Sequence, residues 1–211
     1  MEPSVQLDPF RVLVQAIVRA DVTRAAEMLA ASPNLAREFA VYGATRRLTG
    51  ESFFDDIMHY MYEGDTALHM AAAAYRENIA IELIAKGADV RARNRRGAEP
   101  LHYAADGAPD FRHWNPSAQA ATIACLIKAG ADPNAVDKSG VAPLHRAVRT
   151  RCAGAVKALL VGGANVRARN RSGATPTVLA NQNTGRGGTG TPTAKAQQEE
   201  ILRLLAEYGA T

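Results

Sequence analysis

Three histidines stand in similar local sequences, and their side chains could take part in chemistry. His69, His102 and His145 are separated by 33 and 43 residues, and each follows a leucine. Imidazole side chains bind metals and transfer protons near neutral pH. Whether these three could act together depends on the elements that carry them.

Two smaller groups could also do chemistry. Asp55 and His59 are four residues apart and could ligate a metal from one face of a predicted helix. The second group could act as an acid and a base: Asp106, Asp110 and His113, beside Trp114. Neither group has the spacing of a known motif. We interpret them as a solvated helix face and an ordinary loop, and we predict no catalytic residue, metal or cofactor.

Arginines form two clusters without an intervening acidic residue. The first contains Arg91, Arg93, Arg95 and Arg96, and the second contains Arg167, Arg169 and Arg171. Guanidinium groups pair with carboxylates and phosphates through two hydrogen bonds, which favours an acidic or phosphorylated partner. The formal net charge is only +4, so the local distribution matters more than the total. The clusters could equally be solvated loop arginines that aid solubility.

The elements that carry these residues repeat along the chain. One mark recurs as Gly64-Asp-Thr-Ala-Leu-His69, Gly97-Ala-Glu-Pro-Leu-His102 and Gly140-Val-Ala-Pro-Leu-His145, with a fainter copy from Gly173. The intervals between the glycines are 33, 43 and 33 residues, so the middle copy carries an insertion of 10 residues. A second mark follows in step, at Gly87-Ala, Gly130-Ala, Gly163-Ala and Gly209-Ala.

The two marks resemble those of the ankyrin-repeat family, whose unit of about 33 residues carries a Thr-Pro-Leu-His signature. The resemblance covers residues 64–211 well and 10–38 loosely. It implies an all-α solenoid of about five stacked helix-turn-helix repeats with loop fingers, in a single domain, 1–211. The predicted parts are an N-terminal capping repeat at 10–38, an insertion at 39–63, repeats at 64–94, 95–137 and 138–170, and a C-terminal capping repeat at 171–211.

The resemblance also implies roles for individual residues. The histidines would be scaffold residues that bond backbone across the turn. The positions after them, Met70, Tyr103 and Arg146, would face outward on the concave side. One turn further come Ala73, Asp106 and Arg149. Aromatic and arginine side chains at these positions would be interface anchors.

Insertions on a regular scaffold are frequent sites of function. In residues 39–63, Phe54, Ile57, Met58 and Met61 share a helical face, which predicts an extra helix across the solenoid near the loop tips. The insertion at 106–117 brings Trp114, expected to be a loop anchor. Residues 181–193 are glycine-rich and predicted to be mobile.

These features predict a non-catalytic protein-interaction scaffold that binds an acidic or phosphorylated protein through its concave face and arginine-rich loop tips. The predicted contact residues are Arg91, Arg93, Arg95, Arg96, Tyr103, Asp106, Trp114, Arg146, Arg149, Arg167, Arg169 and Arg171. We expect a monomer. We also expect a cytoplasmic location, because Cys125 and Cys152 are too few for a disulfide framework and no apolar run nears the roughly 20 residues of a membrane span.

Two alternative functions stay open. A small-molecule site or unusual enzyme could be built from the insertions at 39–63 and 106–117, which lie on opposite edges unless the first folds across the concave face. Polyanion or nucleic-acid binding would need a continuous basic surface. We do not expect nucleic acid to bind, because Asp132 and Asp137 lie between the two arginine clusters.

Overall fold

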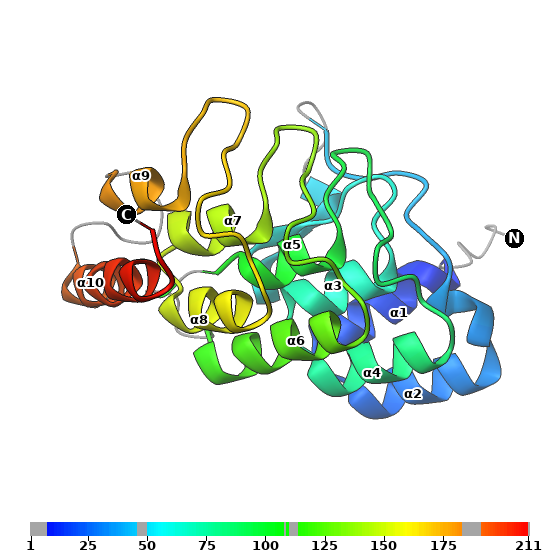
Figure 1. Cartoon of the computed structure of the whole chain (residues 1–211). Coiled ribbons are helices and arrows are strands. Elements are labelled where there is room, and N and C mark those ends of the chain that lie inside the picture. Colours follow the sequence, from blue (N-terminus) through cyan, green and yellow to red (C-terminus); the bar gives the residue numbers. More distant parts are fainter. Residues whose placement is uncertain (1–7, 46–49, 108, 110–113, 183–190, 211) are drawn as a thin grey trace, which may run out of the picture.

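The chain folds into two rows of helices stacked in sequence order, with long loops projecting from one side (Figure 1). A computed structural model describes residues 8–45, 50–107, 109, 114–182 and 191–210. The inner row holds α1 (Pro9–Val18), α3 (Ala67–Ala73), α5 (Pro100–Ala105), α7 (Pro143–Arg149) and α9 (Pro176–Asn181). The outer row holds α2 (Val22–Ala31), α4 (Glu77–Ala85), α6 (Pro116–Lys128), α8 (Ala153–Val161) and α10 (Pro192–Glu207). The predicted all-α solenoid is confirmed.

Local sequence explains where these helices begin and end. A proline occupies the first turn of α5, α7 and α9, where its missing N–H would have no helical partner. Glycines recur at two places that need a positive φ, the finger tip and the end of the outer helix. Gly97 (φ +75°) and Gly130 (φ +101°) are examples from one repeat.

The recurring histidines connect consecutive repeats. In each, Nδ1 accepts a hydrogen bond from the backbone N–H three residues earlier, at 3.1–3.2 Å. Nε2 then donates to a carbonyl of the next repeat: His69 to Ala98 at 3.1 Å, His102 to Val141 at 3.0 Å and His145 to Ala174 at 3.3 Å. Their predicted scaffold role is confirmed.

The core is a continuous band between the two rows. Leucines of the signature, such as Leu101, meet leucines of the outer helices, such as Leu126, and both are fully buried. Each inner helix contacts the next inner helix and its own outer helix. Abundant buried alanines let the helices approach closely. At the C-terminal end α10 packs on α8 and α9.

The insertion at 39–63 does not form the predicted helix. It contains 3₁₀ turns, η2 (Gly50–Ser52) and η3 (Asp55–Ile57), and two short antiparallel strands, β1 (Phe53–Phe54) and β2 (His59–Tyr60). A further 3₁₀ turn, η1 (Pro33–Ala36), follows α2. The rings of Phe53 and Tyr60 lie 4.6 Å apart across the strand pair, so cross-strand aromatic packing outweighs the helical spacing of the apolar residues.

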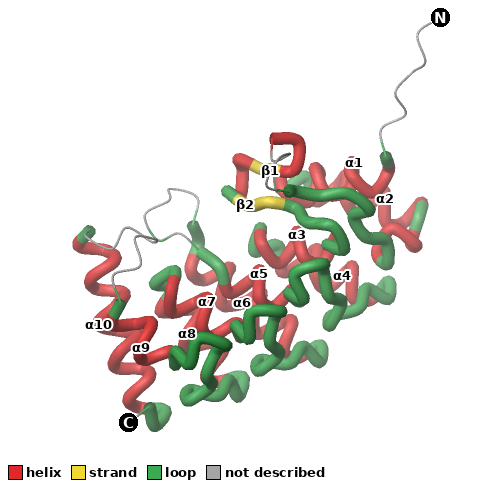
Figure 2. The backbone as a smooth tube through the Cα atoms, turned by 90° about the horizontal axis from the view of Figure 1, so that it is seen from above, coloured by secondary structure: helices red, strands yellow, loops and turns green. Residues whose placement is uncertain are grey.

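We call residues 50–62 the hairpin. It lies beside the inner helices at the N-terminal half of the solenoid (Figure 2). Among the described residues, no helix is both long enough and apolar enough to cross a membrane.

Candidate functional site

The loop fingers are joined tip to tip by backbone hydrogen bonds. Arg95 N–H donates to Glu63 at 2.9 Å, Lys138 N–H to Arg96 at 2.9 Å, and Arg171 N–H to Ser139 at 3.2 Å. Neighbouring tips are therefore in direct contact. The exposed cations at these tips, Arg95, Arg96, Lys138 and Arg171, form one line that we call the finger-tip row.

Most arginines of the first cluster have partners within the chain. Arg93 pairs with the buried carboxylate of Glu99 at 3.0 Å, and Arg91 lies 3.6 Å from Asp132. Arg95 donates to the carbonyl of Ala44. The guanidinium of Arg96 lies 4.9 Å from the centre of the Tyr62 ring, a cation–π contact. The first cluster thus supports its own fingers as well as facing solvent.

The second cluster is bonded mainly to backbone. Arg167 Nε donates to Gly209 at 2.9 Å, and an Nη of Arg169 donates to Gly173 at 2.9 Å. All three side chains of this cluster, Arg171 included, remain exposed.

Asp137 does not interrupt the finger-tip row, because its side chain is turned inward. Its carboxylate accepts from the backbone N–H groups of Ser139 and Val141 at 2.8 and 3.1 Å, and from Arg146 at 3.1 Å. Burial opposes ionisation, but these donors lower the pKa of Asp137. The carboxylate is therefore charged and neutralised within the molecule, which weakens one of the two arguments against a continuous basic surface.

The residues expected to face outward on the concave side are buried. Met70 is fully buried, Tyr103 is 1% exposed and Arg146 is 9% exposed. The ring of Tyr103 lies between His59 of the hairpin, at 4.4 Å, and His69, at 5.1 Å. The expectation was wrong because the hairpin packs on Tyr103, Met70 belongs to the apolar core, and Arg146 pairs with two aspartates. Ala73 is also buried, whereas Asp106 and Arg149 are partly exposed.

Tyr103 belongs to a buried polar group at the base of the first fingers. Its hydroxyl donates to Asp65 at 2.8 Å, and Asn94 donates both to Asp65 at 2.8 Å and to the Tyr103 oxygen at 2.9 Å. The group explains why an asparagine stands at position 94, because an aspartate there could not donate to Asp65.

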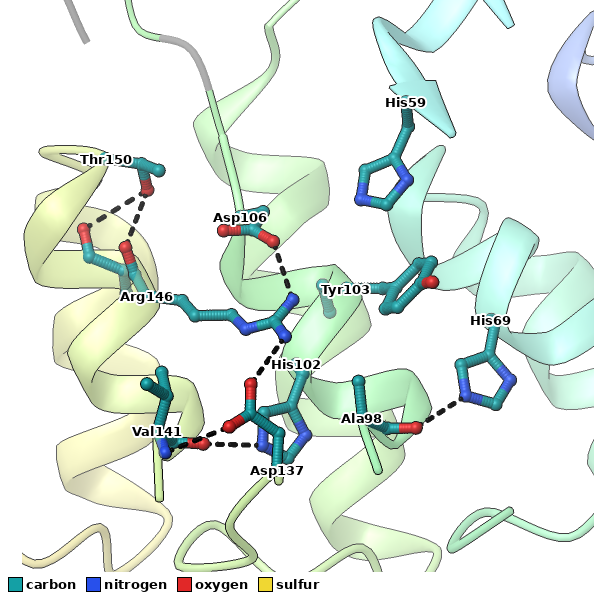
Figure 3. Close-up of polar contacts among 12 residues, drawn as sticks. His59, His69, Ala98, His102, Tyr103, Asp106, Asp137, Val141, Arg146 and Thr150 are labelled. Carbon is teal, nitrogen blue, oxygen red and sulfur yellow. Dashed lines mark hydrogen bonds and ion pairs between the residues drawn. The ribbon is translucent and has the colours of Figure 1, made fainter. Parts of the chain in front are cut away.

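Arg146 links three elements through two ion pairs (Figure 3). One Nη lies 2.9 Å from Asp106, at the end of α5, and the other lies 3.1 Å from Asp137, in the next finger. Burial disfavours the cation, but the two aspartates raise the pKa of Arg146. We call these three residues the Arg146 triad. It is an internal link, so neither Arg146 nor the Asp106 oxygen that it bonds is a free anchor for a partner.

The two insertions meet, because the hairpin folds across the concave face. They line a cleft with two lobes of about 390 and 480 Å³ that share Met58, His59, Asp106 and Gly107. We call this the hairpin cleft. The far lobe is bounded by the ends of α1 and α3 and by Trp114, and the near lobe by Arg96, Ser139 and α7. Volumes of this order are typical of ligand pockets.

Trp114 anchors the insertion between α5 and α6, as expected. Its Nε1 donates to Gln119 at 2.9 Å, and Gln119 in turn donates to the carbonyls of Ala104 and Asp106 at 2.9 and 3.1 Å. Trp114 also packs against the core and lines the far lobe. This anchoring fixes one wall of the cleft.

The two small groups proposed from spacing have different outcomes. Asp55 lies in η3 and His59 in β2, so they do not share a helix face. Of the second group, Asp106 belongs to the Arg146 triad, while Asp110 and His113 lie outside the described residues, as do residues 183–190 of the glycine-rich segment. Within the described residues, no group of three or more His, Cys, Asp or Glu side chains could hold a metal ion.

Sequence reasoning missed Lys138 and Tyr62. Lys138 occupies the same repeat position as Arg95 and Arg171, so aligning the copies around their glycines would have found it. Tyr62 occupies this position before Gly64, but its contact with Arg96 depends on how the hairpin folds back.

Two family profiles match the chain. One, described as ankyrin repeats in three copies, matches residues 23–113, and another, described as ankyrin repeats in many copies, matches residues 126–180. A search of curated proteins finds no match. Together the two profiles cover both halves of the helical stack and agree with the repeat marks and the fold.

Proposed function

The chain belongs to the ankyrin-repeat family, and we propose that it is a scaffold that binds an acidic or phosphorylated protein along its finger-tip row. Repeats of this family are generally protein–protein interaction modules, and its members are typically non-enzymatic. The observation that carries the proposal is the contact between neighbouring tips, which places Arg96, Lys138 and Arg171 in one exposed line. Guanidinium groups suit carboxylates and phosphates.

The surface proposed here differs from the one expected from the sequence. Tyr103 and Arg146 are buried, and Arg93 is engaged by Glu99. The concave face contributes only where the hairpin leaves it open, as at the partly exposed Arg149. The partner would therefore contact mainly the tips.

A triple charge reversal tests the proposal: Arg96→Glu, Lys138→Glu and Arg171→Glu. The matched control reverses three exposed cations of the outer helices, Arg24, Lys128 and Lys157. Proteins captured from the source cells should be acidic or phosphorylated, should be lost from the tip variant and retained by the control, and should dissociate as salt increases. Capture of the same proteins by the tip variant would refute the proposal.

Nucleic acid is the competing polyanion, since the inward turn of Asp137 leaves the row without an acidic tip residue between Arg96 and Arg171. The exposed Glu63 at the first tip and the modest net charge of +4 favour a protein. A mobility-shift titration with DNA and RNA at low ionic strength should show no binding. Salt-sensitive binding that the tip variant abolishes would favour nucleic acid instead.

A further inference from the structure

We infer that the hairpin cleft binds an extended acidic segment of the partner, which threads between the hairpin and the inner helices; this rests on the proposed scaffold function. The hairpin packs on Tyr103 through His59, so the middle of the concave face cannot receive a folded surface there. It leaves a cleft with two walls. One is the hairpin, and the other is formed by α5, α7 and the finger that carries Ser139.

The shape of the cleft favours an extended chain. Its two lobes share four lining residues, Met58, His59, Asp106 and Gly107, and therefore adjoin. An extended strand advances about 3.3 Å per residue and has no bulky cylinder, whereas a helix is about 10–12 Å wide. An extended segment that lies along the four shared residues can therefore occupy both lobes.

The charge of the cleft favours an acidic segment. Five arginines and three aspartates line it, which leaves a surplus of two positive charges: Arg19, Arg76, Arg96, Arg146 and Arg149 against Asp56, Asp106 and Asp137. Arg146 is already neutralised by two of the aspartates. The other arginines are divided between the lobes, with Arg19 and Arg76 in the far lobe and Arg96 and Arg149 in the near lobe. Each lobe can thus receive an acidic side chain.

Polar groups without partners within the described structure are available for the backbone of such a segment. His59 lines the cleft and uses Nδ1 for the carbonyl of Tyr60, while its Nε2 has no hydrogen bond to the described residues. The hydroxyls of Tyr60 and Ser139 also have no hydrogen bond there, and Nε of Arg76 is buried without a partner. Of these residues, Ser139 is exposed, whereas the buried Arg76 Nε and the half-buried His59 and Tyr60 favour a ligand that bonds them.

The test blocks each lobe separately. Ser139→Trp fills the near lobe and Ala118→Trp fills the far lobe, and both side chains line the cleft. Ser172→Trp is the matched control, because Ser172 occupies the position of Ser139 in the next finger and does not line the cleft. Circular dichroism confirms that the variants are folded. The probe is a phage-displayed library of random dodecapeptides selected on the wild-type chain, followed by labelled synthetic copies of the enriched peptides.

We expect enriched peptides with at least two acidic residues. Their affinity should fall at least tenfold on Ser139→Trp and on Ala118→Trp, and should change less than twofold on Ser172→Trp. Bound peptide should slow amide exchange in residues 50–62. Unchanged affinity on both blocking variants overturns the cleft inference, and faster exchange in the hairpin does so too, because the hairpin would then be displaced.

The result separates this inference from the proposed function. The tip variant could lose the captured proteins while both tryptophan variants bind the peptides as tightly as the wild type. This result would support the scaffold function and refute the cleft inference. The selection could also enrich no peptide, while citrate stabilises the wild-type chain but not Ala118→Trp. That result would overturn the inference that a peptide binds and would favour a small anion as the ligand of the cleft.

Discussion

Burial keeps the three signature histidines in their neutral form. Each signature histidine is enclosed between two repeats, with Nδ1 accepting one backbone N–H and Nε2 facing a carbonyl. Burial lowers the pKa values of His69, His102 and His145, so these rings are neutral at pH 7. A residue type suited to catalysis therefore acts here as a connector that depends on staying uncharged.

His102 should make stability sensitive to mild acid. Burial, with a contribution from the nearby Arg146 cation, lowers its pKa from 6.5 to about 4. Between these values the unfolded chain binds a proton that the folded chain does not. The free energy of unfolding should thus be greatest above pH 6.5 and fall by about 3 kcal/mol as the pH falls to 4. Urea unfolding at a series of pH values measures this.

A histidine-selective NMR titration provides the control for this prediction. The His102 ring should stay neutral down to about pH 4–5, and His102→Gln should flatten that part of the pH dependence. Titration of the His102 ring near its ordinary pKa of 6.5 in the folded chain would contradict the proposed origin of the acid sensitivity.

Elements differ in how far their sequence determines them. The repeat helices were predictable, because Pro100 and Pro143 mark the starts of α5 and α7 and glycines such as Gly130 mark the ends of outer helices. The hairpin was not predictable. Its apolar residues fit a helical period as well as a strand pair, and the choice was made by packing against Tyr103, a residue more than 40 positions away from His59.

The candidate site was predicted only in part for the same reason. The arginine clusters and Trp114 were found, but the inward turn of Asp137 and the burial of Arg146 follow from contacts between elements distant in sequence. No local sequence pattern predicts that Asp106 and Asp137 pair with the two terminal nitrogens of Arg146.

The Arg146 triad should be essential to the alignment of α5, α7 and the finger between them. Arg146→Ala should lower the free energy of unfolding by about 3 kcal/mol or more, because it leaves two partly buried carboxylates without their cation. Arg146→Lys should recover only part of this loss, since one ammonium cannot match both carboxylates. Urea denaturation measures both. Arg24→Ala, at an exposed site, is the control and should cost little; an equally small loss for Arg146→Ala would contradict the role of the triad.

At the scale of the whole molecule, stability is built from contacts between neighbouring repeats, as in other solenoids. The C-terminal end is closed by α10, which buries Ile201, Leu204 and Leu205. Its Gln197 side chain accepts from the backbone N–H of Ala153 at 2.9 Å. The helix α10 therefore supplies both apolar and polar contacts to α8.

Deletion of residues 191–211 should destabilise the chain from that end. Loss of three buried aliphatic side chains should cost roughly 5 kcal/mol. Hydrogen exchange should accelerate most in α7, α8 and α9 and least in α1 and α2, because coupling passes through successive interfaces. Leu204→Ala is a milder comparison and should show the same gradient at smaller amplitude. Uniform acceleration along the chain would instead indicate one indivisible cooperative unit.

The hairpin has a consequence for altering the specificity of this scaffold. The repeat resemblance predicts that the side chains at positions 70 and 103 face solvent, where variation would change binding without affecting folding. Here Met70 is buried in the core, and Tyr103 is buried against His59 of the hairpin. Substitutions at these two positions would therefore affect folding before they affected the recognition of a partner. Variation at the exposed tips and along the cleft walls is therefore the route by which this chain could acquire a new partner without losing its structure.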